Sequence, residues 1–303
     1  MNPFALSMDK GRRENMEDAA YAFLFTPIIG PPIWVGMVLD GVGGHAAGEV
    51  ASNLGKLILS KALASDLVVA DGDDVAPEGQ IAVLTQALQQ ANEAIASAAA
   101  SGEHAGMAST AVCVITIGRL LYVAWVGDSR CYLDRGGQIR QLTRDHSAVQ
   151  QLVASGMLDP QEAKDHPLAH TITRYLGQAK GFVVETALWH IRPGDLLVLC
   201  SDGLTDVMSD QAIALRVGQC LNRPGGLHAL PHQLLEDALA AGTQDNVTVL
   251  CYQHPVLGDA QNLSSAPTLT GAYPAELAQA IKQIHEENAN GKHTSPSVRV
   301  TVR

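Results

Sequence analysis

Residues 38–45 read VLDGVGGH, and this stretch joins the end of an apolar run to an acid and a glycine-rich turn. The apolar run covers residues 33–39, IWVGMVL, and a short uninterrupted run of this kind is typical of a buried β-strand. Asp40 follows the run directly, so its carboxyl group is expected at the exit of the strand, where a side chain can leave the core. The chemistry of the chain is therefore expected at this end of the strand.

Two other stretches have the same form as the first. Residues 195–201, DLLVLCS, lead to Asp202, and Asp245 precedes the apolar run VTVLC at residues 247–251. Three such strands can bring Asp202, Asp245 and Asp40 to one rim of a sheet. Carboxylates gathered in this way repel one another unless cations neutralise them, and their oxygens favour hard ions such as Mg²⁺ or Mn²⁺. The pattern predicts a metal-dependent hydrolase.

The composition limits the class of protein and its partners. The chain has 303 residues, of which 47% are hydrophobic, enough for one large domain or two small ones. A net charge of −11 argues against nucleic acid or an anionic membrane as the main partner. The apolar runs are too short for a membrane span, and the N-terminal residues lack the pattern of a signal peptide. The five scattered cysteines include no C-x-x-C pair, so we expect a reducing, cytoplasmic location.

The periodicity of the middle of the chain indicates helices followed by hairpins. Helical patterns cover residues 46–63 and 80–100, separated by an acidic loop at 66–79. β-rich runs at 111–117 and 120–126 are joined by a two-residue turn and precede a third strand, which predicts an antiparallel sheet. Asp128 lies in the break before the third strand, where it is either a turn former or a metal ligand.

Two segments differ in character from the rest. Residues 155–169 are polar, contain proline and lack an apolar stripe, so the region of about 147–175 is expected to form a mobile flap. Its histidines, His166 and His170, are too loosely spaced to predict a ligand pair. Residues 254–303 are expected to form an appendage, with a linker and one short amphipathic helix, after a catalytic domain at 1–253.

A polar cluster, GRRENMED, occupies residues 11–18 ahead of an apolar strand. Two arginines beside acids are compatible with an ordinary solvated turn. They are also compatible with an anion-binding arginine beside acids that face a metal, since the planar guanidinium can bind two phosphate oxygens. The local sequence leaves both interpretations open.

Six motifs occur in an order that resembles one family. They are RRENMED at 12–18, DGVGGHAAGEVAS at 40–52, VGDSR at 126–130, LTRDHS at 142–147, SDGLTD at 201–206 and DNVTV at 245–249. Together they resemble the bacterial form of the metal-dependent protein serine/threonine phosphatases of the protein phosphatase 2C (PPM) type. The resemblance covers roughly residues 5–253 and implies an α+β fold: a central antiparallel β-sandwich flanked by helices on both faces, in α-β-β-α layers.

The resemblance also implies a set of metal ligands. Asp40 would bridge two ions, Mn²⁺ or Mg²⁺, and the carbonyl of Gly41 would bind the second ion. Asp202 and Asp245 would complete the first ion's shell.

The remaining roles fall on the polar cluster and on the strand break. Glu17 and Asp18 would act through the second metal or through bound water. Asp128, together with Asp202, would hold a third and weaker ion. Arg13 would bind the substrate phosphate.

These residues suit hydrolysis by water. Two ions about 3.5–4 Å apart can share a water and lower its pKa, so that hydroxide attacks phosphorus in line while Arg13 offsets the charge. Some members of the family have a histidine directly after the Asp-Gly pair as a proton donor. Val42 occupies that position here, so this role is not transferred.

The expected activity is hydrolysis of phosphoserine and phosphothreonine, with phosphorylated proteins, including a serine/threonine kinase or its substrates, as partners of a monomer. A pseudophosphatase that serves as a phosphoprotein-binding scaffold is the alternative, although the complete aspartate set argues against it. Hydrolysis of small phosphomonoesters is a third possibility that the sequence separates poorly from the first.

Overall fold

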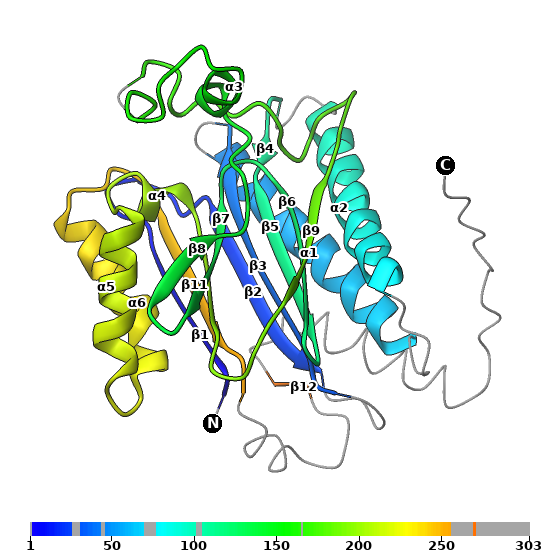
Figure 1. Cartoon of the computed structure of the whole chain (residues 1–303). Coiled ribbons are helices and arrows are strands. Elements are labelled where there is room, and N and C mark those ends of the chain that lie inside the picture. The colour runs from blue at the N-terminus through cyan, green and yellow to red at the C-terminus, as the bar shows by residue number, and fades with distance from the viewer. Residues whose placement is uncertain are drawn as a thin grey trace.

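Two antiparallel sheets stack face to face at the centre of the computed structural model, which describes residues 2–25, 31–43, 46–69, 77–100, 105–164, 166–255 and 269–270. Helices α1 (Ala46–Val69) and α2 (Pro77–Ala100) cover one outer face, and α5 (Asp210–Leu221) and α6 (Gly226–Ala240) cover the other (Figure 1). The expected α-β-β-α sandwich is confirmed.

The two sheets are built from antiparallel neighbours throughout. The first sheet has the strand order β1 (Phe4–Asp9), β11 (Val247–Gln253), β10 (Leu196–Cys200), β7 (Arg130–Arg135) and β8 (Gln138–Gln141). The second has the order β12 (Leu269–Thr270), β2 (Asp18–Phe25), β3 (Ile33–Val42), β5 (Ala111–Ile117), β6 (Leu120–Val126) and β9 (Glu185–His190). The short β4 (Ala108–Ser109) pairs with the end of β3.

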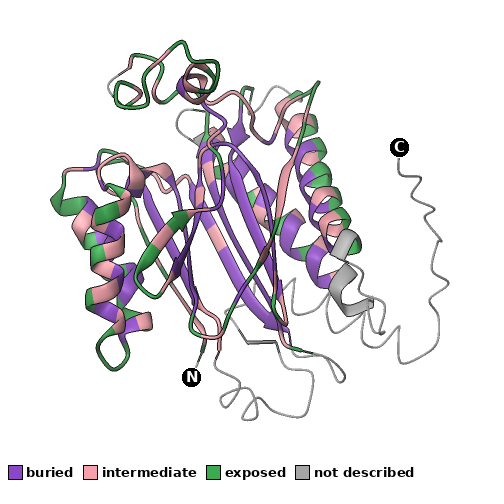
Figure 2. Cartoon of the chain, viewed as in Figure 1, coloured by how far each residue is buried: buried purple, intermediate pink, exposed green. Residues whose placement is uncertain are grey.

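The central strands are apolar on both faces because each face packs against a different layer. Along β3, Met37 and Leu39 face the helices α1 and α2, whereas Trp34 and Val38 face the other sheet. Trp34 stacks on Tyr252 of β11 across the sheet interface, with ring centroids 4.0 Å apart. Figure 2 shows buried residues concentrated in the strands of both sheets. The apolar runs seen in the sequence therefore are buried strands, and their polar ends reach the rim.

The boundaries of several elements differ from the expected ones. Helix α1 continues to Val69, and α2 begins at Pro77, so the loop expected at 66–79 is shorter than the acidic stretch. Pro77 suits the first turn of a helix, where no backbone N–H is needed. The sequence pattern predicts a strand over residues 181–189, but β9 begins only at Glu185.

The structure describes only residues 254–255 and 269–270 of the expected appendage, and it describes most of the expected flap. Residues 269–270, expected in a linker, pair with β2. The short amphipathic helix expected within residues 254–303 lies outside the described residues, as does most of the expected appendage. In the segment expected as a flap, α3 (Ala148–Ala154) is followed by turns and projects from one end of the sandwich (Figure 1). Among the described helices, none combines the length and apolarity that crossing a membrane requires.

Candidate metal centre

Hydrogen bonds made by its backbone N–H and carbonyl fix the position of Asp40 near the end of β3. Its N–H donates to Thr110 Oγ1 (3.0 Å), and its carbonyl accepts from the N–H of Thr110 (2.8 Å) and the hydroxyl of Ser109 (3.0 Å). The register of β2 on β3 places Asp18 directly opposite Asp40. Two carboxylates therefore meet on one rung of the second sheet.

The glycines that follow Asp40 permit a close approach of three backbone segments. The N–H of Gly41 donates to the carbonyl of Glu17 (3.2 Å), and a Cβ on Gly41 would collide with that oxygen and with the carbonyl of Gly48. A Cβ on Gly48 would lie 2.6 Å from Oε2 of Glu17. Gly41 therefore permits the approach of the Glu17 and Gly48 backbones, and Gly48 leaves room for the Glu17 carboxylate beside the end of β3.

Asp202 comes from the other sheet and lies at the start of α4 (Asp202–Thr205), immediately after β10. The preceding residue, Ser201, links the two sheets: its hydroxyl donates to Asp18 Oδ2 (2.7 Å) and accepts from the N–H of Thr248 (3.0 Å). Oδ1 of Asp202 is buried and has no hydrogen-bond partner. A buried carboxylate oxygen without a donor is costly, and a cation would satisfy it.

Asp245 lies next to the polar cluster of residues 11–18. Its Oδ2 accepts from Arg13 Nη2 at 2.6 Å, in a pair whose side chains are 53% and 35% exposed. The neighbouring Asn246 is buried and fastens the cluster: its Nδ2 donates to the carbonyls of Lys10 (2.8 Å) and Asn15 (3.0 Å). The cluster is therefore no simple solvated turn, because its backbone is bound to the start of β11.

Asp128 lies in the turn between β6 and β7, and the residues around it are held on both sides. The N–H of Gly127 donates to Nδ1 of His146 (3.1 Å), and the N–H of His146 donates back to the carbonyl of Gly127 (2.9 Å). On the other side, Ser129 and Thr110 share a hydrogen bond of 2.7 Å between their hydroxyls. Thr110 therefore connects the Asp128 turn to the Asp40 backbone.

The carboxylates of the rim act on one another electrostatically. Loss of surrounding water, followed by the charges of Asp202 and Asp18, raises the pKa of Asp40 well above its ordinary value. Loss of water and then the charge of Asp128 raise the pKa of Asp202 well above its own ordinary value. Burial is also the largest cause that raises the pKa of Asp18 and that of Asp128, each to about 6. Such a surplus of negative charge fits divalent cations.

The profile of the protein phosphatase 2C family matches residues 10–152 and 183–247, more than half of the chain. The chain belongs to the protein phosphatase 2C family. The two matched ranges contain five of the six motifs, the first three residues of the sixth and all the carboxylates described above, and they omit residues 153–182 between them.

Members of the protein phosphatase 2C family with known names are similar along most of this chain. The serine/threonine protein phosphatase PstP of Mycobacterium tuberculosis is 37% identical over 254 residues, which are 82% of this chain and 44% of that protein. This chain therefore spans about half the length of that relative. The serine/threonine phosphatase stp of Listeria welshimeri is 31% identical over 229 residues, 75% of this chain and 87% of that protein.

Solved structures of the family have the same fold. The serine/threonine phosphatase of S. agalactiae superimposes with a TM-score of 0.73 at 31% identity, covering 83% of this chain and 98% of that one. The catalytic domain of PstP in complex with two manganese ions superimposes with a TM-score of 0.67 at 33% identity, covering 82% and 96% of the two chains.

The structure also contains residues around the centre whose importance we did not predict. Ser201, Asn246, Ser129 and His146 all lie inside the quoted motifs, next to or near the predicted ligands. Their hydrogen bonds hold the predicted ligands or the backbone and side chains beside them. For Ser201, Asn246 and Ser129, the available sequence signal was their adjacency to the predicted aspartate ligands.

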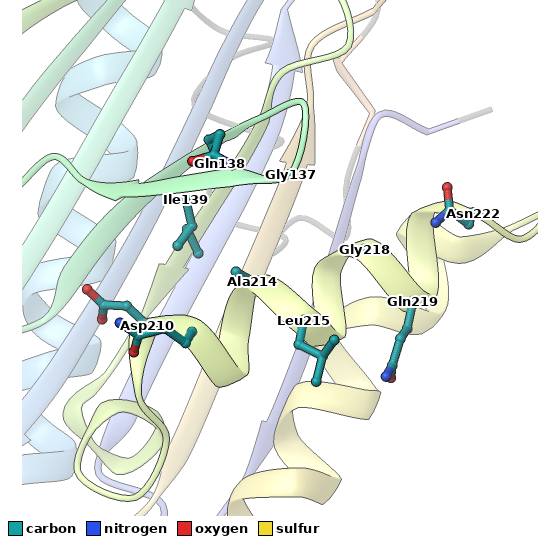
Figure 3. Close-up of a pocket in the computed structure, with 10 residues that line it drawn as sticks. Gly137, Gln138, Ile139, Asp210, Ala214, Leu215, Gly218, Gln219 and Asn222 are labelled. Carbon is teal, nitrogen blue, oxygen red and sulfur yellow. The ribbon is translucent and has the colours of Figure 1, made fainter.

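A groove of about 800 Å³ lies between the β7–β8 hairpin and α5 (Figure 3). Ile139 of β8 and Leu215 of α5 contribute apolar surface, and Asp210 lies at the start of the helix. Its lining residues come from the hairpin and from α5 and its C-cap, so it is separate from the carboxylate cluster of this phosphatase 2C fold.

Proposed function

We propose that this chain is a metal-dependent protein serine/threonine phosphatase that hydrolyses phosphoserine and phosphothreonine. The observation that carries the proposal is the meeting of carboxylates from both sheets at one rim, where Asp202 Oδ1 is buried without a hydrogen-bond partner. The alternative, a pseudophosphatase scaffold, gains no support from a centre that retains all the predicted aspartates.

The proposed ligands are those that the resemblance to the family implies. Asp40 would lie between two ions, either Mn²⁺ or Mg²⁺, with Asp202 and Asp245 on the first and the carbonyl of Gly41 on the second. Glu17 would act on the second ion directly or through water. When bound, the two ions would supply a water activated for attack on phosphorus.

Two further carboxylates have supporting roles in the proposal. Asp18, paired with Asp40 across the sheet and hydrogen-bonded by Ser201, would orient water or the second ion. Asp128 would hold a third and weaker ion with Asp202, consistent with its position in the turn that Thr110 ties to Asp40.

Arg13 is the proposed phosphate-binding residue. Its side chain is 53% exposed at the edge of the cluster, and its bond to Asp245 keeps the guanidinium beside the proposed metal ligands. Because a guanidinium carries five N–H donors, Arg13 can hold Asp245 and a phosphate oxygen at the same time. The charge of the phosphate would then be offset at the point of attack.

The protonation of the leaving oxygen is assigned to water. The residue after Gly41 is Val42, an apolar side chain that is 41% exposed, and it has no proton to donate.

We further propose that residues 147–175 act as a flap, that 254–303 form an appendage to the catalytic domain at 1–253, and that the chain is a cytoplasmic monomer. Its substrates would be phosphorylated proteins, including a kinase or the targets of one.

Hydrolysis of a phosphothreonine peptide with Mn²⁺, with Mg²⁺ and with a chelator tests the reaction class. We expect turnover that requires metal and that disappears in Asp40→Ala but persists in Glu93→Gln, a change on the exposed face of α2. Turnover that survives the chelator would refute the metal-dependent mechanism. Metal binding without turnover would favour the pseudophosphatase scaffold. Faster turnover of small phosphate esters than of phosphopeptides would favour hydrolysis of small phosphomonoesters as the function.

A further inference from the structure

The two ends of the segment 147–175 meet at His146, the buried residue that precedes it. The carbonyl of His146 accepts from the N–H (2.7 Å) and from the hydroxyl (3.0 Å) of Thr173, near the far end of the segment. The N–H of His146 donates to the carbonyl of Gly127 (2.9 Å), the residue before Asp128. The backbone of one residue therefore joins the base of the segment to the turn that carries Asp128.

The imidazole of His146 binds two further groups through its ring nitrogens. Nδ1 accepts from the N–H of Gly127 (3.1 Å), so this nitrogen carries no proton. Nε2 lies 2.9 Å from Oε2 of Glu185, at the start of β9, and in the neutral ring it carries the proton and donates it to this oxygen. Burial lowers the pKa of His146 and so favours the neutral ring. One tautomer, with its hydrogen on Nε2, therefore satisfies both partners.

The segment reaches the same imidazole through Arg174. Its Nη1 lies 3.4 Å from Oε2 of Glu185 and 3.3 Å from Nε2 of His146. Because Nε2 donates its own proton, the Glu185 carboxylate is the acceptor that Arg174 and His146 share. Trp125 of β6 stacks on the imidazole, with ring centroids 6.2 Å apart and planes 11° from parallel. The ring is therefore held in one orientation by two strands and the end of the segment.

An ordinary buried histidine would need fewer partners than His146 has. Its backbone N–H, its carbonyl and both ring nitrogens are all hydrogen-bonded. The partners come from three places that are distant in the sequence: the turn before Asp128, the end of the segment and β9. A carboxylate that fixes the tautomer of a histidine is also a common way to orient that ring for a task.

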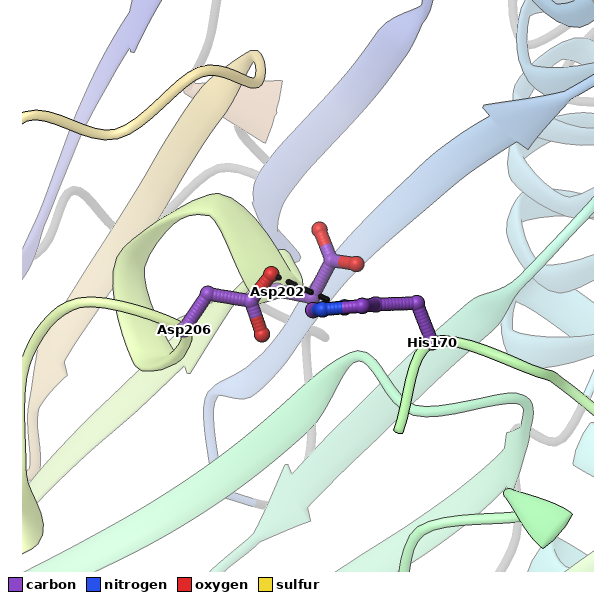
Figure 4. A group of neighbouring side chains, drawn as sticks. All are labelled: His170, Asp202 and Asp206. Carbon is purple, nitrogen blue, oxygen red and sulfur yellow. Dashed lines mark ion pairs between the residues drawn. The ribbon is translucent and has the colours of Figure 1, made fainter. Parts of the chain in front are cut away.

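A second histidine of the segment makes a more exposed contact with the rim. His170 Nδ1 is 3.3 Å from Asp206 Oδ2 (Figure 4), and the two side chains are 71% and 37% exposed. A pair that is open to water contributes little to stability. Of these two contacts, the buried one at His146 is therefore the firmer link between the segment and the centre.

We propose that His146 is a positioning residue that couples the end of the segment 147–175 to the turn of Asp128, and that Glu185 holds it in the required tautomer. The consequence for metal binding rests on the proposed function, because it takes Asp128 as a ligand. An ion on Asp128 would stabilise the turn and the segment end together, and by linkage an ordered segment end would favour the ion. Removing a residue that orients a metal ligand typically weakens metal binding about 10- to 100-fold.

Mn²⁺ binding to the full chain tests the link to the Asp128 turn. His146→Phe keeps a ring and removes both ring nitrogens, while the segment end stays attached through two hydrogen bonds between Leu176 and Ser109 (2.7 and 3.1 Å). Counting free Mn²⁺ by electron paramagnetic resonance, we expect the weakest bound ion to be lost or weakened at least about 10-fold in His146→Phe, as in Asp128→Asn.

Hydrogen–deuterium exchange of the same proteins tests the link to the segment. In the wild type, Mn²⁺ should slow exchange across residues 170–176, because opening of this end then competes with ion binding. In His146→Phe, Mn²⁺ should leave this exchange unchanged. The control is His254→Phe, at a half-buried histidine whose Nδ1 lies 3.1 Å from the hydroxyl of Tyr252, and it should match the wild type in both measurements.

Nitrogen NMR of the imidazoles in Mg²⁺ tests the role of Glu185. The His146 signals, assigned by their loss in His146→Phe, should show hydrogen on Nε2 in the wild type and a mixture of tautomers in Glu185→Ala. Glu236→Ala removes the acid of an exposed His–Glu pair on α6 and should leave the His146 signals unchanged.

Hydrogen on Nδ1 of His146 in the wild type would overturn the proposal. So would a Mn²⁺ effect on exchange that is equal in wild type and His146→Phe, or absent from both. Phosphopeptide turnover by the wild type tests the proposed function separately. Turnover without the coupling would refute only the positioning role, whereas coupling without turnover would refute only the hydrolase.

Discussion

At the scale of single residues, the positions of the proposed metal ligands depend on polar side chains that bind other parts of the protein. Asn246 is the clearest case, because it joins the start of β11 to the loop that contains Arg13. Its Oδ1 accepts from the N–H of Glu17 at 2.6 Å, and its Nδ2 donates to two carbonyls of the same loop. One amide therefore sets the position of both a proposed ligand and the proposed phosphate-binding arginine.

Asn246→Ala is expected to lower both stability and activity. Removing the amide leaves buried backbone groups without partners, which should reduce the free energy of unfolding by roughly 2–3 kcal/mol. Urea unfolding measures the first effect and phosphopeptide turnover the second. Asn53→Ala, on an exposed part of α1, is the control and should change the unfolding free energy by less than about 0.5 kcal/mol. An unchanged urea midpoint in Asn246→Ala would contradict this role.

Arg13→Lys keeps the positive charge but loses the planar fork. We expect kcat/KM for a phosphopeptide to fall by roughly 10- to 100-fold, since a lysine cannot hold Asp245 and a phosphate in the same geometry. The adjacent Arg12 is exposed and contacts Gln244 at 3.4 Å, so Arg12→Lys is a matched control that should retain activity. Equal losses in the two variants would mean that general positive charge, and not the fork of Arg13, is what matters.

At the scale of elements, the turns between strands carry the ligands and constrain the backbone. Gly127, before Asp128, has φ +98°, and a Cβ there would lie 2.6 Å from side-chain atoms of Thr110. Gly136, in the β7–β8 turn, also has positive φ (+61°), but a Cβ there would meet no atom within 4 Å. Comparison of alanine substitutions at these two glycines therefore separates the effect of backbone conformation on stability from the effect of crowding.

Gly127→Ala should be the more damaging of the two changes. Both variants carry the cost of a left-handed alanine, about 1–2 kcal/mol, and only Gly127→Ala adds a clash with Thr110. We expect a total loss of roughly 2–4 kcal/mol for Gly127→Ala, read from urea unfolding. Equal losses in Gly127→Ala and Gly136→Ala would show that Thr110 moves aside at little cost.

At the scale of the whole molecule, the rim concentrates negative charge where the two sheets meet. Asp18 and Asp128 each have a pKa of about 6 in the folded chain, against an ordinary value of 3.8. Folding therefore favours their protonated forms. This contribution to stability is complete below the unfolded pKa and is lost as the pH rises through the folded pKa.

The metal-free chain is consequently expected to lose stability as the pH rises from about 4 to about 7. A shift of about two pKa units in one carboxyl corresponds to roughly 3 kcal/mol, so the total loss should be at least of that order. Saturating Mg²⁺ should flatten the profile, because the cation takes the place of the protons. Urea unfolding at several pH values with chelator or with Mg²⁺ measures both profiles, and coincident slopes would contradict the assignment of a cation site to the rim.

The sequence by itself determined the local elements and the order of the motifs. Apolar runs that end on aspartates are visible because each strand interior is buried on both faces, and the helices follow from their own periodicity. Asp40, Asp202 and Asp245 could therefore be named as neighbours at a rim. The boundaries at Val69 and Glu185 were less predictable, because α1 continues beyond its apolar stripe and pairing with β6 begins only at Glu185.

Only the tertiary structure decided which side chains meet across the sheets. The pairing of Asp18 with Asp40 depends on the register of β2 on β3, and the bond from Ser201 to Asp18 depends on how the two sheets stack. His170 contacts Asp206 because the segment after α3 folds back over α4. The spacing of the histidines along the chain does not predict this contact. Periodicity records which face of an element is buried, whereas contacts between distant elements are set by the packing of whole layers.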